Sequence, residues 1–186
     1  MKKIIHCIRH GQSTFNALFE VTQADPLHFD APLSALGHEQ VRTTAPAVAD
    51  THYELVVTSP LTRALQTTLG LFGGHPQNPP ILVEALHREH LANSCDVGRP
   101  PSVLARDFPE LTFGHLDEVW WHNDGAPDER GIHVEPIAVV EERAHAFRAW
   151  LAARPERSIA VVGHGTFFFH LMGHRFANCE IVAFDL

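Results

Sequence analysis

Short apolar runs form the clearest pattern along the chain, and they predict strands. Three runs are rich in β-branched residues, which is typical of strands buried on both faces: Ile4–Ile8, Glu54–Thr58 and Ser158–Val162. Weaker runs at Ile81–Val83 and Glu180–Phe184 predict two more strands. The expected sheet is therefore built from short, mostly buried strands.

Apolar residues at helical spacing separate these runs. The spacing predicts helices at residues 34–48, 61–72, 136–154 and 165–172. Ser34 is a candidate N-cap for the first helix, and Gly73-Gly74 would end the second. Because strands and helices alternate, we expect an α/β sandwich around a mostly parallel sheet. With 186 residues the chain can bury one core, so we expect a single domain over residues 1–186.

The stretch from Glu84 to about His133 lacks this regularity. It is rich in Pro, Gly, Asp, His and Trp, and we expect an excursion over the sheet edge with one short helix near Pro101–Phe108. Long excursions often act as lids or substrate walls, and an ordinary surface insertion is the alternative. Its larger side chains could line a pocket or form a satellite core: Arg99, Phe108, Phe113, His115, Trp120, Trp121 and His122.

Composition and charge argue against several classes of protein. Hydrophobic residues make up 45% of the chain and charged residues 19%, which is typical of a globular protein. The net charge of −8 disfavours a nucleic-acid partner, because such binding needs a basic face. No apolar stretch approaches the roughly 20 residues that cross a membrane.

The N-terminus and the cysteines bear on location. Met1-Lys2-Lys3 is basic, but the apolar run after it is shorter than the roughly 7–15-residue core of a signal peptide. Cys7, Cys95 and Cys179 form no CxxC pair, which argues against a disulfide framework and a zinc–thiolate site. We expect a cytoplasmic protein.

Arginine and histidine residues follow the three strong strand runs. These positions are Arg9-His10-Gly11, Ser59–Arg63 and Gly163-His164-Gly165. Because the carboxyl ends of parallel strands meet at one edge of a sheet, we expect the three loops to form one site. The glycines would let the backbone approach a ligand, and the N-termini of the following helices would face an anion.

Two arginines and two histidines around one small space suit phosphoryl chemistry. A guanidinium group pairs with phosphate oxygens, and a neutral imidazole can attack phosphorus. Arg9 and Arg63 match the charge of a phosphate dianion. Either His10 or His164 could attack, while the other donates a hydrogen bond to an oxygen.

Four motifs extend this pattern along nearly the whole chain. They are Arg9–Asn16, Pro32–Gly37 with Gln40, Ser59–Thr67 and Gly163–Gly165. In order and spacing they resemble the histidine phosphatase superfamily, in the branch related to cofactor-dependent phosphoglycerate mutase. The resemblance implies a three-layer α/β/α sandwich and a phosphohistidine intermediate on His10.

The resemblance also implies which side chains surround the phosphate. These are Arg9, Arg63 and His164, with Asn16 contributing. No cofactor and no metal are implied, because the arginines take the place of a cation. The expected partner is a small phosphorylated substrate.

The family's proton donor is a carboxylate, which the resemblance places at Glu89. The glycine–tryptophan–glutamate run that usually follows this acid is absent here. Glu84 and Asp96 are therefore alternative donors. Arg88, Arg99 and Arg106 could extend the pocket toward a polyanion, or they could lie on the protein surface.

Hydrolysis of a phosphomonoester is the reaction that we expect. His10 would attack phosphorus while Arg9, Arg63 and a protonated His164 stabilise the oxygen charge. Glu89 would protonate the leaving group and then activate water.

Other functions stay open. A phosphoglycerate mutase-type transfer is the first alternative, although this chain is compact for one. A metal-dependent hydrolase is less favoured, since His87 and His90 are not part of an HExxH motif. A non-enzymatic protein that binds a phosphorylated ligand is the third alternative. The substrate and the oligomeric state are not readable from the sequence.

Overall fold

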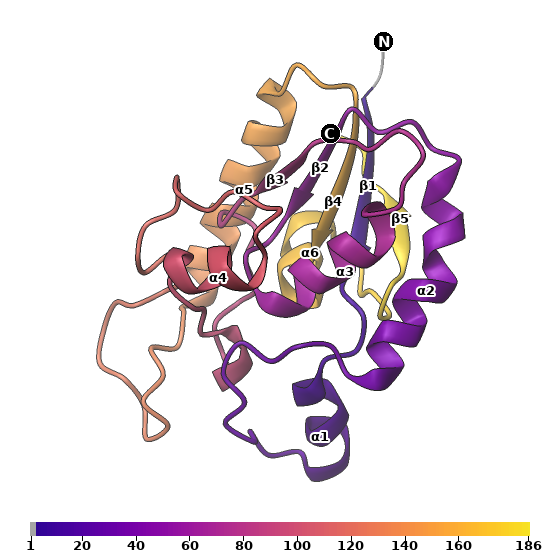
Figure 1. The fold of residues 1–186 in the computed structure, drawn as a ribbon. Helices are drawn as coiled ribbons and strands as arrows, with labels where there is room; N and C mark the ends of the chain where they lie inside the picture. The colour runs from indigo at the N-terminus through magenta and orange to yellow at the C-terminus, as the bar shows by residue number, and fades with distance from the viewer. Residues whose placement is uncertain (1–2) are drawn as a thin grey trace.

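A five-stranded sheet forms the centre of the computed structural model, which describes residues 3–186 (Figure 1). Met1 and Lys2 of the basic N-terminus lie outside the described residues. The strands, in chain order, are β1 (Ile4–Arg9), β2 (Leu55–Thr58), β3 (Ile81–Val83), β4 (Ser158–Gly163) and β5 (Ile181–Ala183). Their order in the sheet is β3-β2-β4-β1-β5. All neighbours are parallel except β5, which pairs antiparallel with β1, so the predicted mostly parallel sheet is confirmed.

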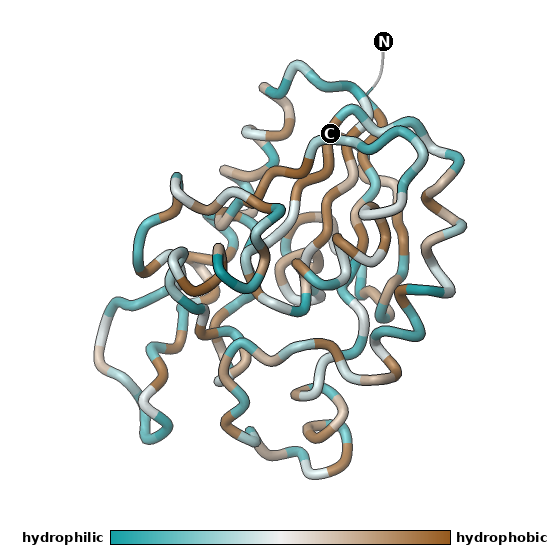
Figure 2. The backbone as a smooth tube through the Cα atoms, viewed as in Figure 1, coloured by the Kyte–Doolittle hydropathy of each residue, from teal (hydrophilic) through white to brown (hydrophobic). Residues whose placement is uncertain are grey.

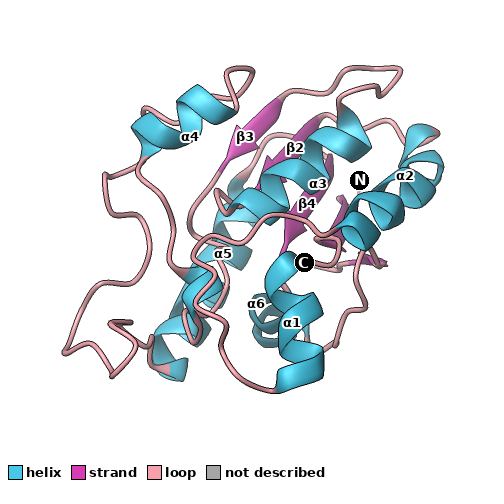
Figure 3. Ribbon diagram, turned by 60° about the horizontal axis from the view of Figure 1, so that its bottom comes forward, coloured by secondary structure: helices cyan, strands magenta, loops and turns pink. Residues whose placement is uncertain are grey.

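Four of the six helices in residues 3–186 cover the faces of this sheet. In chain order the helices are α1 (Thr14–Thr22), α2 (Ala35–Ala49), α3 (Thr62–Phe72), α4 (Pro101–Asp107), α5 (Ile137–Ala153) and α6 (Gly165–Met172). Helices α2 and α3 pack together on one face, and α5 and α6 pack on the other (Figures 1 and 3). The three-layer α/β/α sandwich is therefore confirmed.

Alternation along the strands explains why both faces are covered. On β1, Ile5 and Cys7 pack with the apolar side of α5 and α6, whereas Ile8 packs with α2 and α3. On β4, Val161 and Val162 divide in the same way. The strands form the brown, apolar centre of Figure 2. Continuous apolar runs are the pattern that this double burial requires.

Helix α1 was not predicted from the apolar pattern. Only Phe15 of its nine residues is buried, and Phe19 stacks on it one turn later at 5.4 Å, so the apolar side of this helix is short. Its start is fixed instead by a capping box: the Ser13 hydroxyl accepts the Asn16 N–H, and the Asn16 side chain accepts the Ser13 N–H. The helix lies beyond the carboxyl end of the sheet (Figure 1).

The irregular segment 84–133 has two parts with different roles. Its later part contains α4 and packs against β3 and α3, where Leu104, Phe108, Phe113 and Trp120 form an apolar cluster. The satellite-core interpretation is therefore correct for these side chains. Trp121 lies on no strand, and its ring meets that of Trp120 edge-on at 5.5 Å. The earlier part, near residues 89–96, lies at the carboxyl end of the sheet and lines a cavity.

Helix length and composition bear on membrane insertion. Among residues 3–186, no helix combines the length and the apolar character that a membrane crossing requires.

Candidate active site

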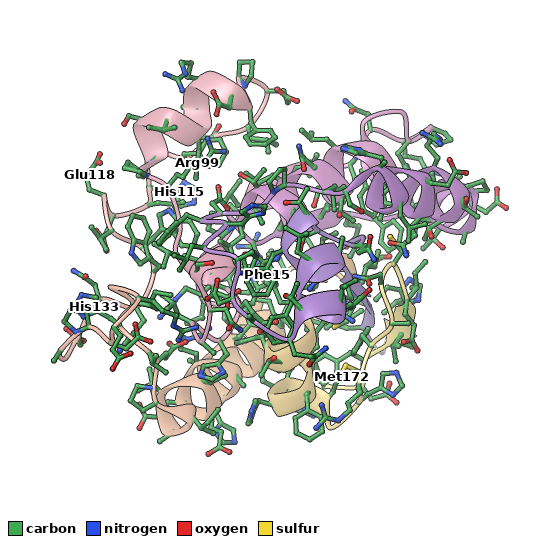
Figure 4. All side chains as sticks on the ribbon, turned by 90° about the horizontal axis from the view of Figure 1, so that it is seen from below. Phe15, Arg99, His115, Glu118, His133 and Met172 are labelled. Carbon is green, nitrogen blue, oxygen red and sulfur yellow. The ribbon has the colours of Figure 1, made fainter. Side chains whose placement is uncertain are left out.

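A cavity of about 430 Å³ opens where β1 and β4 end. Its walls come from residues between 9 and 19, from Arg63 on α3, from residues between 89 and 96, and from residues between 165 and 176. Phe15, which belongs to this wall, lies near the middle of the view in Figure 4. Arg99, His115 and His133 lie away from it, along the side formed by segment 84–133. A volume of this size suits a small metabolite.

His10 lies in this cavity with a fixed tautomer. The Arg63 Nε–H donates to His10 Nε2 at 3.2 Å, so Nε2 carries a lone pair. The ring proton is therefore on Nδ1, which donates to the Gly11 carbonyl at 2.7 Å. Burial lowers the pKa of His10 well below its usual range, and the nearby Arg63 and Arg9 charges lower it further. The ring is therefore neutral, and its Nε2 carries the lone pair that nucleophilic attack would use.

Arg63 is held on two sides. Its guanidinium donates to the Cys95 carbonyl at 2.6 Å and to the Asp96 carboxylate at 2.8 Å. The Arg63 and Asp96 side chains are 3% and 5% exposed, so this ion pair is almost completely desolvated. Thr67, one turn along α3, accepts the Gly11 N–H and donates to the Arg63 carbonyl, which joins α3 to the loop after β1.

Arg9 reaches the cavity from the end of β1. One of its terminal nitrogens donates to the Phe176 carbonyl at 2.7 Å, while its buried Nε has no partner. Gly165 lies against this guanidinium, since a Cβ there would be 3.2 Å from Arg9 Nε. The free Nε–H is a donor available to a phosphate oxygen.

His164 lies directly beside His10, with ring centroids 5.2 Å apart. It is completely buried and does not line the cavity, so it reaches a ligand only past His10. Its Nε2 bonds to the Ser59 hydroxyl at 2.7 Å, and its buried Nδ1 has no partner. Burial and the charge of Arg63 lower the pKa of His164 well below its usual range. The expectation of a protonated His164 is therefore wrong for the free site.

Two further expectations about this site need correction. The glycine at 11 packs against the chain itself, because a Cβ there would lie 2.7 Å from the Gly37 carbonyl oxygen. The first turns of the helices are also occupied: Ser13 accepts from α1, Asp30 from Thr62 of α3, and Glu89 from α6. The N-termini of these helices are therefore not open to a bound anion, and side chains are the donors that remain at the cavity.

Glu89 lines the cavity, where its carboxylate sits on the N-terminus of α6. It accepts the N–H groups of Thr166 at 3.0 Å and Phe167 at 2.9 Å, and also that of His90. A helix N-terminus favours a negative charge, which explains this position. Glu84 does not line the cavity, and its carboxylate accepts the Leu86 N–H instead.

Asp96 is the other carboxylate on the cavity wall. Burial raises its pKa to about 6, although the Arg63 charge opposes the rise. One oxygen accepts from Arg63 and the other from the Asn93 N–H. The structure thus brings Glu89 and Asp96 to the site and leaves Glu84 outside it.

The family follows from comparison with known proteins. The model of the histidine phosphatase superfamily, branch 1, matches residues 5–184. The chain belongs to this superfamily.

Proteins of plants and bacteria are similar to this chain. Phosphoglycerate mutase-like protein 1 of Arabidopsis thaliana is 30% identical over 96% of this chain and 79% of its own length. Glucosyl-3-phosphoglycerate phosphatase of Mycolicibacterium vanbaalenii is 28% identical over 85% of this chain and 67% of its own. A mycobacterial glucosyl-3-phosphoglycerate phosphatase solved with vanadate has the same fold, with a TM-score of 0.61 and 21% identity over 97% of this chain and 90% of the other.

Asn16 has a structural contact in this histidine phosphatase as well as a place on the cavity wall. Its side-chain oxygen accepts from Ser13, which leaves the amide nitrogen as its donor toward the cavity. The prediction that Asn16 contributes to phosphate binding stays a prediction.

Several other candidates lie outside the cavity lining. Arg88, Arg99 and Arg106 form ion pairs with Glu135, Asp30 and Asp107. His87 is buried against β4, where it bonds to the Val162 carbonyl, while His90 lines the cavity. No three His, Cys, Asp or Glu side chains of residues 3–186 are grouped as a metal site would need.

Some residues that support the site were not predicted from the sequence. Ser59 and Thr67 lie within a matched motif, and their side chains bond to His164 and Gly11. Asn178 donates to the His10 carbonyl, and Arg175 lines the cavity. The stretch after α6 carries no apolar period, and its residues reach the site only because β5 returns beside β1.

Proposed function

We propose that this histidine phosphatase hydrolyses a small phosphomonoester through a covalent phosphohistidine on His10. The observation that carries the proposal is the state of the His10 ring. Its Nε2 holds a lone pair toward Arg63, and its Nδ1–H is anchored on Gly11. A neutral, oriented imidazole between two guanidinium groups is suited to in-line attack on phosphorus.

The arginines supply the positive charge that the reaction needs. In the proposed complex, a phosphate oxygen takes the Nε–H of Arg63 away from His10 and another takes the free Nε–H of Arg9. His164, neutral and with Ser59 bonded to Nε2, donates from Nδ1 to a third oxygen. Oriented donors of this kind stabilise charge on the equatorial oxygens.

Glu89 is the proposed proton donor to the leaving oxygen. It lies on the cavity wall beside Gly165 and Thr166, and it forms no ion pair with an arginine. After the alcohol leaves, the same carboxylate takes a proton from the water that attacks phosphohistidine. Asp96 is engaged with Arg63, and we assign it the task of holding that guanidinium.

The first test is the substitution His10→Ala. It should lower kcat for an aryl phosphate by at least roughly 10³-fold, because the covalent intermediate cannot form. A brief reaction of the unchanged protein, quenched in alkali, should trap phosphate on His10, and mass spectrometry would locate it. His133→Ala, in an exposed loop away from the cavity, is the matched control. Substantial turnover by His10→Ala, with thermal unfolding unchanged, would contradict the proposal.

A second pair of variants tests the proton donor. Glu89→Gln should slow hydrolysis of an alkyl phosphate roughly 10²-fold or more, while an ester with a good leaving group should be affected less. Asp96→Asn should raise KM through Arg63 without this dependence on the leaving group. If Asp96→Asn shows the dependence and Glu89→Gln does not, the donor assignment is wrong.

Assays on the unchanged purified protein distinguish the alternative functions. Phosphoglycerate mutase activity, measured in parallel with released phosphate, distinguishes transfer from hydrolysis. Binding of vanadate without turnover of any ester would favour a protein that only binds phosphorylated ligands.

A further inference from the structure

Arg175 is the third arginine of the cavity wall, and its guanidinium has an unusual environment. It lies over the ring of Phe169, with its central carbon 4.6 Å from the ring centroid. Within residues 3–186, its side chain has neither a hydrogen-bond partner nor an ion-pair partner. All five of its N–H donors are therefore available to a ligand.

The position of Phe169 on α6 shows where this charge lies. Gly165, Thr166, Phe169 and His170 form one face of the helix and line the cavity, while Phe167 and Phe168 point into the core. Arg9 contacts Gly165 at the start of this face. Phe169 lies four residues further on, which is about 6 Å along the helix axis. Arg175 is thus one helical turn from the proposed phosphate position.

Arg175 is not needed for the reacting phosphate. Arg63 contacts His10 directly, and Arg9 is its neighbour in the chain. These two cations already match a phosphate dianion. Arg9 is also held by the carbonyl of Phe176, so the backbone next to Arg175 is tied to the phosphate end of the cavity. The cavity therefore has two cationic ends at a set distance from each other: the end at Arg9 and Arg63, where we propose that the phosphate binds, and the end at Arg175.

We infer that Arg175 binds a second anionic group of the substrate. The preferred substrates would then be phosphomonoesters that carry a carboxylate or another phosphate, separated from the reacting phosphate by a short carbon bridge. This inference rests on the proposed function, because it assumes that the reacting phosphate lies at His10.

Phe169 acts as the platform for this interaction. The ring holds the flat guanidinium by a cation–π contact and leaves its edge free for a carboxylate or phosphate. Because the side chain is already positioned, less rotational freedom is lost when the anion binds. A lysine could retain the charge but not the stacked, two-pronged geometry.

The experiment compares substrates that differ only in the second anion. 3-Phosphoglycerate and glycerol 3-phosphate share one carbon skeleton and differ by a carboxylate; propanediol bisphosphate and propanediol monophosphate differ by a phosphate. For each pair, Arg175→Ala should lower the ratio of kcat/KM for the ester with the second anionic group to kcat/KM for the simple ester about tenfold, which corresponds to about 1.4 kcal/mol. Arg175→Lys should restore part of it. A change in the first pair alone identifies a carboxylate site, and a change in the second alone identifies a phosphate site.

Arg148→Ala is the matched control. Arg148 lies over the Phe184 ring at 4.9 Å, so this variant also removes one charge and one cation–π contact, but outside the cavity. The inference would be overturned if the kcat/KM ratios stay unchanged in Arg175→Ala. An equal loss of kcat/KM for both members of each pair would leave the ratios unchanged and would overturn it too.

Measurements of binding without turnover test this inference independently of the proposed function. Calorimetry with His10→Ala measures affinity for the same four esters without turnover. Weaker binding of the esters with a second anionic group when Arg175→Ala is added would support the second anion site even if no ester is hydrolysed. Equal affinity in both backgrounds would overturn it even if His10 proves to be the nucleophile.

Discussion

Histidine residues in this protein differ by environment rather than by sequence context. His10, His87 and His164 are buried, and burial lowers the pKa of each. Neutral imidazole is what a nucleophile at His10 and a donor at His164 require. His87 has a different role: its ring stacks on Phe147 at 4.7 Å and bonds to the β4 backbone. The same physical effect therefore acts at the two histidines that we propose take part in catalysis and at one histidine that packs in the core.

His87 leads to a prediction about acid stability. Its pKa falls from 6.5 to about 4 on folding, because burial disfavours the charged ring. Between these values the unfolded chain binds the extra proton, so the free energy of unfolding must decrease as the pH falls from 6.5 to 4. The shift corresponds to roughly 3 kcal/mol for this residue.

Urea unfolding at a series of pH values measures this effect. His87→Phe keeps the aromatic contact and removes the titration, so its stability should decline less steeply on acidification than that of the unchanged protein. His133→Ala, at a partly exposed position, should follow the unchanged protein. Parallel curves for His87→Phe and the unchanged protein would contradict the assignment.

At the scale of elements, the loop of residues 86–91, which carries Glu89, is held by a buried ion pair between Arg143 of α5 and Glu135. Arg143 makes two hydrogen bonds to Glu135, at 2.9 and 2.8 Å, and also donates to the carbonyls of Leu86 and Arg88. Glu135 is 1% exposed and accepts the Leu91 N–H. The ends of this short loop are thus tied down on both sides of the Glu89 carboxylate.

Arg143→Met should destabilise the protein and impair catalysis. The substitution leaves the buried Glu135 carboxylate with less compensation, which should cost about 3–5 kcal/mol in unfolding free energy. It should also lower kcat more than it raises KM, since Glu89 loses its support while the arginines near His10 remain. Urea unfolding and steady-state kinetics measure the two effects.

The surface offers a matched control for this ion pair. Arg154 also pairs with a glutamate through two hydrogen bonds, at Glu156, but the pair is partly exposed. Arg154→Met should cost less than about 1 kcal/mol. A loss in Arg143→Met no larger than that in Arg154→Met would show that the buried pair does not hold the loop.

At the scale of the whole molecule, strand order creates the site. Strand β4 lies between β1 and β2, with Arg9 paired to Gly163 and Thr58 paired to Val162. The next residues along each strand are His10, His164 and Ser59, which therefore meet at one edge. The net charge of the chain is −8, yet this edge gathers Arg9, Arg63 and Arg175 around one cavity.

Metal removal tests whether these arginines supply the catalytic charge. Dialysis against a chelator should leave phosphatase turnover unchanged, because Arg9 and Arg63 stand where a cation would otherwise be needed. Loss of turnover that is restored by a divalent metal would contradict this expectation. The measurement is released phosphate before and after chelation, with a metal-dependent phosphatase treated in parallel.

Local patterns were sufficient for much of this protein. The buried strands were predicted because residues covered on both faces form continuous apolar runs. Helices α2, α3, α5 and α6 were predicted because each buries an apolar side against the sheet. The nucleophile motif and the two arginines near it were predicted because their spacing places them where strands end. The family resemblance rested on those same motifs and is confirmed.

Only the tertiary structure decided how these parts work together. Helix α1 is short and buries only Phe15, and it lies beyond the end of the sheet rather than against one of its faces, so it was not predicted. The neutrality of His164, the separation of Glu89 and Asp96 from Glu84, and the place of Arg175 beside the phosphate end all depend on burial and on contacts between distant segments. Sequence determines which chemical groups the chain carries, whereas desolvation and strand order, which arise only on folding, determine their protonation and their neighbours.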